Sequence, residues 1–149
     1  MIVFRVAKKK YAGDLSGVGS KLDGGRWNST GIPMLYASTS RALALLEILA
    51  HSTALPKGRV MLTLQLPTNA RIDKKDLSKL PSGWDEEPPT SVSQNIGDEF
   101  ISAGKFLAMV IPSVIILEES NILINPLHPE ARKIKILKVE ELDVDPRLK

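Results

Sequence analysis

Short apolar runs alternate with polar and glycine-rich stretches along the first half of the chain. Residues 2–6 are mostly β-branched or aromatic and predict an opening strand. Residues 12–31 include six glycines, which favours a shaped loop over a long regular element. Further strands are expected at 34–37 and 59–66, with a helix between them at about 39–52.

The helix expected at 39–52 is apolar around nearly all of its surface. Hydroxyl side chains at positions 38–40 can cap its first turn, and its body consists largely of strong helix formers. A helix that is apolar on every side is usually buried. We therefore expect Glu47, the one acidic residue of this helix, to lie in an apolar setting.

The second half of the chain predicts one more helix and several short strands. Residues 68–89 are polar with prolines near their end and predict mostly loop, and a helix should follow from about 90 or 91 to 104. Residues 133–139 could add a last strand before a frayed tail at 143–149. Three apolar runs resemble hairpin-linked strands, at about 106–111, 114–118 and 121–124.

These elements predict a mixed α+β fold: a mostly antiparallel sheet core with flanking helices, in a single domain over residues 1–149. The apolar fraction of 43% is enough for a real core. The chain has no cysteine, which excludes disulfides, thiolate metal sites and cysteine nucleophiles. No run approaches the roughly 20 apolar residues of a membrane span. The charges at 8–10 follow the apolar start, the reverse of a signal peptide, so we expect a cytoplasmic protein.

The formal net charge of +3 leaves nucleic-acid binding open as one hypothesis, and an ordinary solvated surface accounts for it equally well. A non-catalytic nucleic-acid-binding module would bind in a salt-dependent manner. However, the positive charges are scattered and form no basic stripe with interleaved aromatics. The two histidines, His51 and His128, lack the paired spacing of a zinc site, so no metal is expected.

Glu47 is the first candidate for chemistry. Burying a carboxylate among apolar side chains costs several kcal/mol unless something compensates, and such burial is typical of functional sites. Alternatively, the side chain reaches solvent or pairs with Arg41 or His51. The helix alone does not decide between these interpretations.

Residues 24–28, Gly-Gly-Arg-Trp-Asn, form the second candidate. The glycines allow close approach to a ligand, and Arg26 offers a fixed fork for phosphate or carboxylate. Trp27 could stack or pack, and Asn28 could bind a ligand or cap the turn. A tight turn with one packed tryptophan explains the same residues, and the segment does not match a phosphate loop. Gly17 and Gly19 likewise lack the third glycine of a dinucleotide fingerprint.

Three further residues have weaker signals. Tyr36, just before the expected helix, could stack on a flat ring or simply pack in a strand. Ser113 lacks the surroundings of a nucleophile elbow, which excludes a serine hydrolase but leaves a hydrogen-bonding role. His128 lies in a rigid proline-flanked loop and reads more readily as an exposed loop residue than as a base.

Together these residues resemble the RES domain family, which is named for an arginine, a glutamate and a serine. The resemblance covers most of the chain, although residues 68–105 are not diagnostic. It rests on the following segments: Phe-Arg-Val at 4–6, Gly-Val-Gly at 17–19, Gly-Gly-Arg-Trp-Asn-Ser-Thr-Gly at 24–31, Leu-Tyr-Ala-Ser at 35–38, Ala-Leu-Ala-Leu-Leu-Glu at 42–47 with His51, Ile-Pro-Ser at 111–113 and Asn-Pro-x-His-Pro at 125–129.

The resemblance places the family's named residues on Arg26, Glu47 and Ser113, with Tyr36 grouped with them. It implies a fold similar to ADP-ribosyltransferase toxins of the diphtheria type. It also implies an NAD⁺-degrading toxin held by a DNA-binding, Xre-type helix-turn-helix antitoxin. One branch of the family instead attaches ADP-ribose to a protein.

On this hypothesis NAD⁺ is a substrate, no cofactor is needed, and water attacks after the nicotinamide–ribose bond breaks. Glu47 would stabilise the ribose cation, Ser113 would hydrogen-bond in the pocket, and Arg26, Tyr36, Trp27 and Asn28 would bind NAD⁺. A mono-ADP-ribosyltransferase acting on a cellular protein is the first alternative. We expect no direct nucleic-acid or membrane contact, and a homodimer stays an open option.

Overall fold

The computed structural model describes all 149 residues and is a mixed α+β fold built on one seven-stranded sheet. The strand order is β4-β5-β6-β2-β1-β3-β7. Every pairing is antiparallel except that of β4 with β5. The elements along the chain are β1 (Ile2–Lys8), η1 (Lys9–Tyr11), α1 (Val18–Asp23), β2 (Leu35–Ser38), α2 (Arg41–Ala50), β3 (Arg59–Gln65), β4 (Ile72–Lys74), η2 (Leu77–Lys79), α3 (Ser91–Ala103), β5 (Ala108–Pro112), β6 (Ser120–Ile124), η3 (Pro129–Lys133), β7 (Lys135–Glu141) and η4 (Pro146–Leu148), where η marks a 3₁₀ turn.

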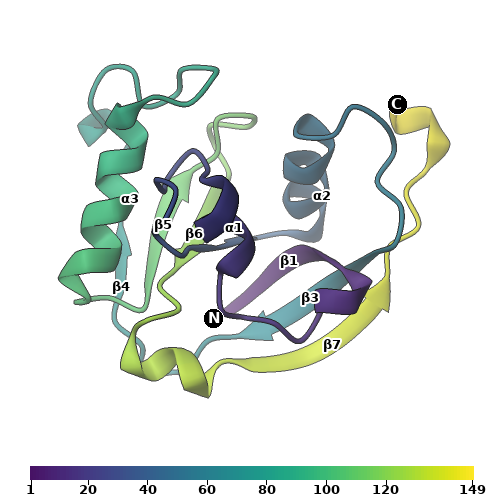
Figure 1. Cartoon of the computed structure of the whole chain (residues 1–149), viewed down its shortest axis with the longest axis horizontal. Coiled ribbons are helices and arrows are strands. Elements are labelled where there is room, and N and C mark those ends of the chain that lie inside the picture. The colour runs from purple at the N-terminus through teal and green to yellow at the C-terminus, as the bar shows by residue number, and fades with distance from the viewer.

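The two longer helices lie over different parts of the sheet. Figure 1 shows α3 beside β4 and β5, α2 above β1 and β3, and α1 between them. Two apolar clusters lie on opposite faces because side chains alternate along each strand. In β6, for example, Ile122 and Ile124 belong to one cluster and Leu123 to the other. The expected α+β fold with a mostly antiparallel sheet is confirmed.

Local capping chemistry sets the helix boundaries. Ser40 begins α2, because its side chain accepts a hydrogen bond from the Leu43 amide. Thr90 does the same for α3, and Gly104 ends that helix in the left-handed region at φ 62°. The predicted helices at 39–52 and 90–104 are therefore confirmed to within two residues at each end. Neither these helices nor the six-residue α1 has the length and apolarity needed to cross a membrane.

One predicted strand is absent from the structure, and three other segments contain short elements that the sequence did not predict. The glycine-rich segment contains the short helix α1, and the expected loop at 68–89 contains β4. The strand predicted at 114–118 is wrong: this apolar run is the loop between β5 and β6, because the pairing of those strands runs only from Ala108↔Ile124 to Pro112↔Ser120. The tail expected to be frayed includes the turn η4.

Candidate active site

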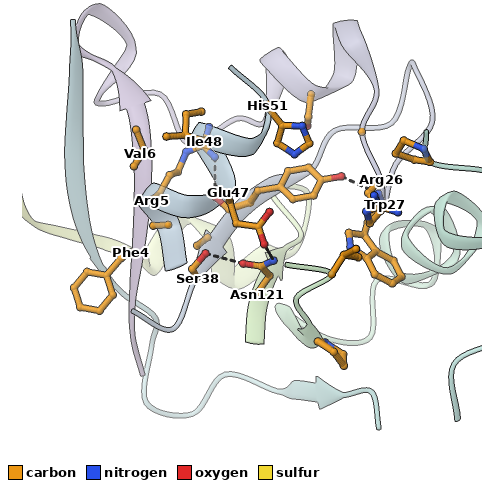
Figure 2. A pocket seen from close by; sticks show the side chains of 18 of the residues that line it. Phe4, Arg5, Val6, Arg26, Trp27, Ser38, Glu47, Ile48, His51 and Asn121 are labelled. Atoms are coloured by element: carbon orange, nitrogen blue, oxygen red, sulfur yellow. Dashed lines mark hydrogen bonds between the residues drawn. The ribbon is translucent and has the colours of Figure 1, made fainter. Parts of the chain in front are cut away.

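A cavity of about 430 Å³ opens between strands β1 and β2, helix α2 and the loop that follows α1. Its volume lies within the range of small-molecule sites, roughly 300–1,000 Å³. Charged residues line it from different elements: Arg5 from β1, Glu47 from α2, and Arg26 and Glu87 from loops. Figure 2 shows Glu47 near the centre of the view, with Arg5 on one side and Arg26 on the other. The structure thus brings Arg26 and Glu47 to one cavity.

Glu47 lies in the second half of α2, on the face toward the cavity. Its Oε1 accepts hydrogen bonds from Ser113 Oγ at 2.9 Å and from Asn121 Nδ2 at 2.5 Å. No protein donor reaches its Oε2, and no cation pairs with it: Arg41 pairs with Glu140 instead. Glu47 is therefore a carboxylate held at one oxygen by neutral donors, with its other oxygen left for a ligand.

The environment of α2 is less apolar than the sequence indicated. Only Leu43, Ala44 and Leu49 are buried, so the prediction of a helix buried on every side is wrong. Glu47 itself is half-buried and meets a serine and an asparagine rather than hydrocarbon. The mostly apolar residues around Glu47 gave no sign that this face of the helix would line a cavity.

Ser113 hydrogen-bonds to Glu47 but does not itself line the cavity. It is fully buried and directly follows β5. While its hydroxyl donates to Glu47, it accepts from the Ile115 amide at 3.0 Å and from the Ile116 amide at 3.3 Å. These two acceptor contacts orient the hydroxyl proton toward the carboxylate.

Asn121 is a second support that sequence reasoning missed. Its Oδ1 accepts from Ser38 Oγ at 2.7 Å, which leaves its amide nitrogen directed at Glu47. The backbone register of β2 and β6 pairs Ser38 with Asn121, so the sheet itself sets this relay. Two polar residues, Ser120 and Asn121, begin this otherwise apolar strand, and nothing in the sequence distinguishes Asn121 for such a role.

The loop at 24–28 is a tight turn closed by a bridge between Gly25 and Asn28. Gly24 has φ 71°, and a Cβ at Gly25 would lie 2.7 Å from the Tyr36 hydroxyl oxygen, so both positions favour glycine. Arg26 extends from this turn. Its Nη1 donates to the carbonyls of Glu86 at 2.7 Å and Trp84 at 3.3 Å, and its Nη2 donates to Glu87 Oε2 at 2.7 Å.

Asn28 and Trp27 hold this turn in place. Asn28 is fully buried, and its amide nitrogen donates to the carbonyls of Ser20 and Ile32, each at 2.8 Å. It does not line the cavity, so its predicted contact with a ligand stays a prediction. Trp27 is buried and reaches the cavity wall, with its ring stacked on that of Trp84 at 5.9 Å.

Tyr36 joins this turn to the sheet. Its hydroxyl donates to Asn28 Oδ1 at 2.6 Å and accepts from the Trp27 amide at 3.1 Å. Burial raises the pKa of the Tyr36 hydroxyl well above its ordinary value, so the group stays protonated. With the hydroxyl occupied, the ring face is the part of Tyr36 that a ligand could contact.

Arg5 is a further cavity residue that sequence reasoning did not single out. Its Nη1 donates to the Tyr36 carbonyl at 2.8 Å, while its Nε is buried without a partner. Burial lowers the pKa of this guanidinium from its ordinary value. The signal was present: strand alternation puts Arg5 on the same side as Val3 and Ala7, which are both buried. A cation between two buried apolar positions indicates a site.

His128 lies outside the cavity. Its Nδ1 accepts from the Glu130 amide at 3.1 Å and so caps the turn η3, and Asn125 is buried beside it. The rigid loop at 125–129 therefore connects β6 to the turn before β7. His51, in contrast, lines the cavity one helical turn after Glu47.

Comparison with known protein families identifies the family to which this chain belongs. The model of the RES domain matches residues 2–145. The chain belongs to the RES domain family. The family membership expected from the motifs is thus confirmed.

Relatives of nearly the same length carry toxin names. "Prs ADP-ribosylating toxin" of Sphingobium sp. (strain YBL2) is 42% identical over 95% of this chain and 91% of its own. "Toxin Res" of Photorhabdus laumondii is 36% identical over 99% of this chain and 97% of its own. "Toxin Res" of Pseudomonas putida is 35% identical, with 99% of both chains covered.

The fold also recurs in a solved complex. A chain in the crystal structure of the M. tuberculosis MbcT–MbcA toxin–antitoxin complex superposes with a TM-score of 0.73 at 17% identity. The match covers 99% of this chain and 85% of that one. At this identity the likeness shows the fold alone, and it agrees with the RES assignment.

Proposed function

We propose that this RES protein is the toxin of a toxin–antitoxin pair and that its cavity cleaves the nicotinamide–ribose bond of NAD⁺. One observation carries the proposal: Glu47, whose Oε2 has no partner, lines the same cavity as Arg5 and Arg26. NAD⁺ has anionic phosphates and a ribose that becomes cationic during cleavage, so it matches both signs of charge. The toxin names of the relatives support the same assignment.

Glu47 would act on the developing positive charge. As nicotinamide departs with the bonding electron pair, the ribose becomes an oxocarbenium-like cation. A carboxylate already fixed by Ser113 and Asn121 needs no reorganisation to stabilise that cation. Its Oε2 would face the ribose, either at the cationic carbon or at a ribose hydroxyl. Ser113 then acts as a positioning residue.

The basic side would bind the phosphates. Arg26 has a planar fork suited to phosphate oxygens, and Arg5 has an unpartnered buried N–H beside the same space. Tyr36 lines the same cavity, and its ring face would stack on nicotinamide. Trp27 would contribute contact area at the edge.

Two acceptors remain for the cleaved ADP-ribosyl group. With water, the products are free ADP-ribose, nicotinamide and a proton, and this hydrolysis is our first candidate. A protein side chain is the second candidate, and the relative named "Prs ADP-ribosylating toxin" at 42% identity favours it. Both candidates use the same carboxylate and differ only in what attacks.

The experiment measures nicotinamide release from labelled NAD⁺ by the purified protein, with and without cell extract. Glu47→Gln keeps the shape and removes the charge, so turnover should fall about 100-fold or more, by analogy with loss of a transition-state donor. Glu99→Gln, the same change at an exposed position of α3, should leave turnover unchanged. Full turnover in Glu47→Gln at an unchanged melting temperature sinks the proposal. Label on protein favours transfer, and free ADP-ribose favours hydrolysis.

We also propose that an Xre-type antitoxin restrains this toxin in the cytoplasm by covering the cavity. The toxin–antitoxin complex that contains a chain of the same fold supports an antitoxin partner. Induced expression should lower cellular NAD⁺, and co-expression of the adjacent gene should restore it. An adjacent gene that leaves NAD⁺ depletion unchanged contradicts the pairing. The homodimer stays a prediction.

A further inference from the structure

Arg26 is not free in this structure, because its two terminal nitrogens are bound in different ways. Nη1 donates to two main-chain carbonyls, those of Trp84 and Glu86. Nη2 donates to a side chain, the carboxylate of Glu87. The Arg26 side chain is only 13% exposed, whereas that of Glu87 is 70% exposed. The ion pair thus joins a covered cation to an anion that is largely in solvent.

The backbone around Glu87 is constrained, so movement there falls to the side chain. Pro88 and Pro89 follow directly and fix their φ angles. Thr90 then caps α3, and its hydroxyl also donates to the Gly83 carbonyl at 3.3 Å. The carboxylate of Glu87 can rotate into water while the carbonyls that anchor Nη1 stay in place.

We propose that Glu87 is an internal stand-in for the substrate's phosphate: it occupies Nη2 of Arg26 in the free protein, and a phosphate oxygen of NAD⁺ displaces it on binding. This inference rests on the proposed function, in which Arg26 binds the phosphates. In the exchange Nη2 keeps one anionic acceptor throughout, and Nη1 keeps both carbonyls. Glu87 therefore lowers the affinity for NAD⁺ and prevents Arg26 from lying unpaired when the cavity is empty.

The size of the effect follows from the exposure of Glu87. Exposed ion pairs change an equilibrium constant by about 1.4- to 5-fold, because solvent screens them. Removing the negative charge of Glu87 should therefore tighten NAD⁺ binding by about 1.4- to 5-fold. The gain should shrink at high salt, where the pair is already screened.

The experiment measures the dissociation constant of NAD⁺ in a Glu47→Gln background, where no turnover interferes. Trp27 and Trp84 are the only tryptophans of the chain and lie beside Arg26, so their fluorescence reports binding at this point. Glu87→Gln is compared with Asp85→Asn, which removes the same charge two residues away, at an exposed position whose side chain makes no hydrogen bond or ion pair. Nicotinamide riboside serves as a ligand without phosphates.

The expected result is tighter NAD⁺ binding in Glu87→Gln, unchanged binding in Asp85→Asn, and no effect of Glu87→Gln on the riboside. Equal NAD⁺ affinity in all proteins overturns this inference and leaves the proposed function standing. Weaker binding in Glu87→Gln also overturns it, because Glu87 would then orient Arg26 for the ligand. An equal gain in Asp85→Asn shows a general charge effect and overturns it as well. No NAD⁺ binding in any variant removes the proposed function together with the inference.

Discussion

The acidic and basic sides of the cavity are built in opposite ways. On the acidic side, Glu47 is held by the neutral donors Ser113 and Asn121, and its charge has no counter-ion. On the basic side, Arg26 has a counter-ion in Glu87 and two carbonyls as further acceptors. The charge of Glu47 is thus fixed in direction and has no counter-ion, whereas the charge of Arg26 is balanced by Glu87, a side chain that can move away.

This difference suggests a division of labour. A carboxylate that must stabilise a transient cation gains from being fixed beforehand and from keeping its charge available. A guanidinium that must bind and release a ligand gains from an alternative partner, since an unpaired buried cation is costly. The two sides are also supported by different elements: the strands β5 and β6 hold Glu47, whereas α3 carries the loop of Arg26.

The largest effect should come from disrupting the contact between α3 and the loop that carries Arg26, because this contact supports only the basic side of the cavity. A Cβ at Gly97 would lie 1.6 Å from the Trp27 carbonyl oxygen, which forces two backbones apart. Overpacking usually costs 1–3 kcal/mol, and backbone cannot rotate away, so Gly97→Ala should lower the free energy of unfolding by about 3 kcal/mol or more. Urea denaturation measures this loss, and NAD⁺ binding should be lost with it.

Gly19→Ala is the matched control. Gly19 lies in α1 with nothing within 4 Å of its added Cβ and without a positive φ. The substitution should be neutral or slightly stabilising, because alanine is the better helix former. If Gly97→Ala leaves the free energy of unfolding as high as Gly19→Ala does, then the contact between Gly97 and Trp27 does not hold the loop against α3.

Other contacts of α3 explain why the loop was hard to foresee. Gln94 Nε2 donates to the Gly25 carbonyl at 3.1 Å, and Asp98 Oδ1 accepts from the Ser29 amide at 2.9 Å. These residues share a helix face with Gly97 by their spacing. The sequence predicted the helix from its cap and its terminal glycine, but what its polar face would touch depends on the fold of a loop about 70 residues earlier.

A second prediction tests the acidic side through Ser113. Hydrogen bonds to charged groups contribute about 1.5–3 kcal/mol, so Ser113→Ala should lower kcat roughly 10- to 150-fold. KM should change little, because the serine touches the carboxylate rather than the ligand. Steady-state kinetics of nicotinamide release separates the two constants.

The background variant shows whether Ser113 acts through Glu47. In Glu47→Gln, the further change Ser113→Ala should cost no additional activity, because the charge that it positions is already gone. Ser102→Ala, an exposed hydroxyl of α3 that donates to its own helix, is the control and should leave kcat unchanged. Independent, additive losses would instead assign Ser113 a role of its own.

Local signals predicted most of the fold, whereas long-range pairing decided the rest. The strong caps at Ser40 and Thr90 fixed both long helices. In contrast, β4 has only three residues, and its parallel partner β5 lies more than 30 positions later. The run at 114–118 is rich in β-branched residues yet lies outside the ladder, since propensity does not set register.

The candidate site shows the same limit. Arg26, Tyr36 and Glu47 could be named from the sequence because the family pattern joins them, and the structure brings all three to one cavity. Asn121 and Glu87 could not be named, because each acts only through a partner that is distant in sequence. Neither residue type nor spacing encodes such a pair.

The smallest effect concerns Tyr36, which ties the basic turn to the sheet that carries the acidic side. Burial raises the pKa of its hydroxyl in the folded protein, so the unfolded chain releases this proton first as the pH rises above about 10. The stability that the protonated hydroxyl contributes is therefore complete below about pH 10 and declines above it, by at most about 1.4 kcal/mol per pH unit. Tyr36→Phe should be less stable at neutral pH, since the Asn28 and Trp27 groups lose their partner, but should show a shallower decline above pH 10.

Urea denaturation between pH 9 and 11 compares the two slopes, with Tyr11→Phe at an exposed position as the variant that keeps the wild-type slope. Identical slopes in wild type and Tyr36→Phe would mean that the hydroxyl is not buried between the two sides.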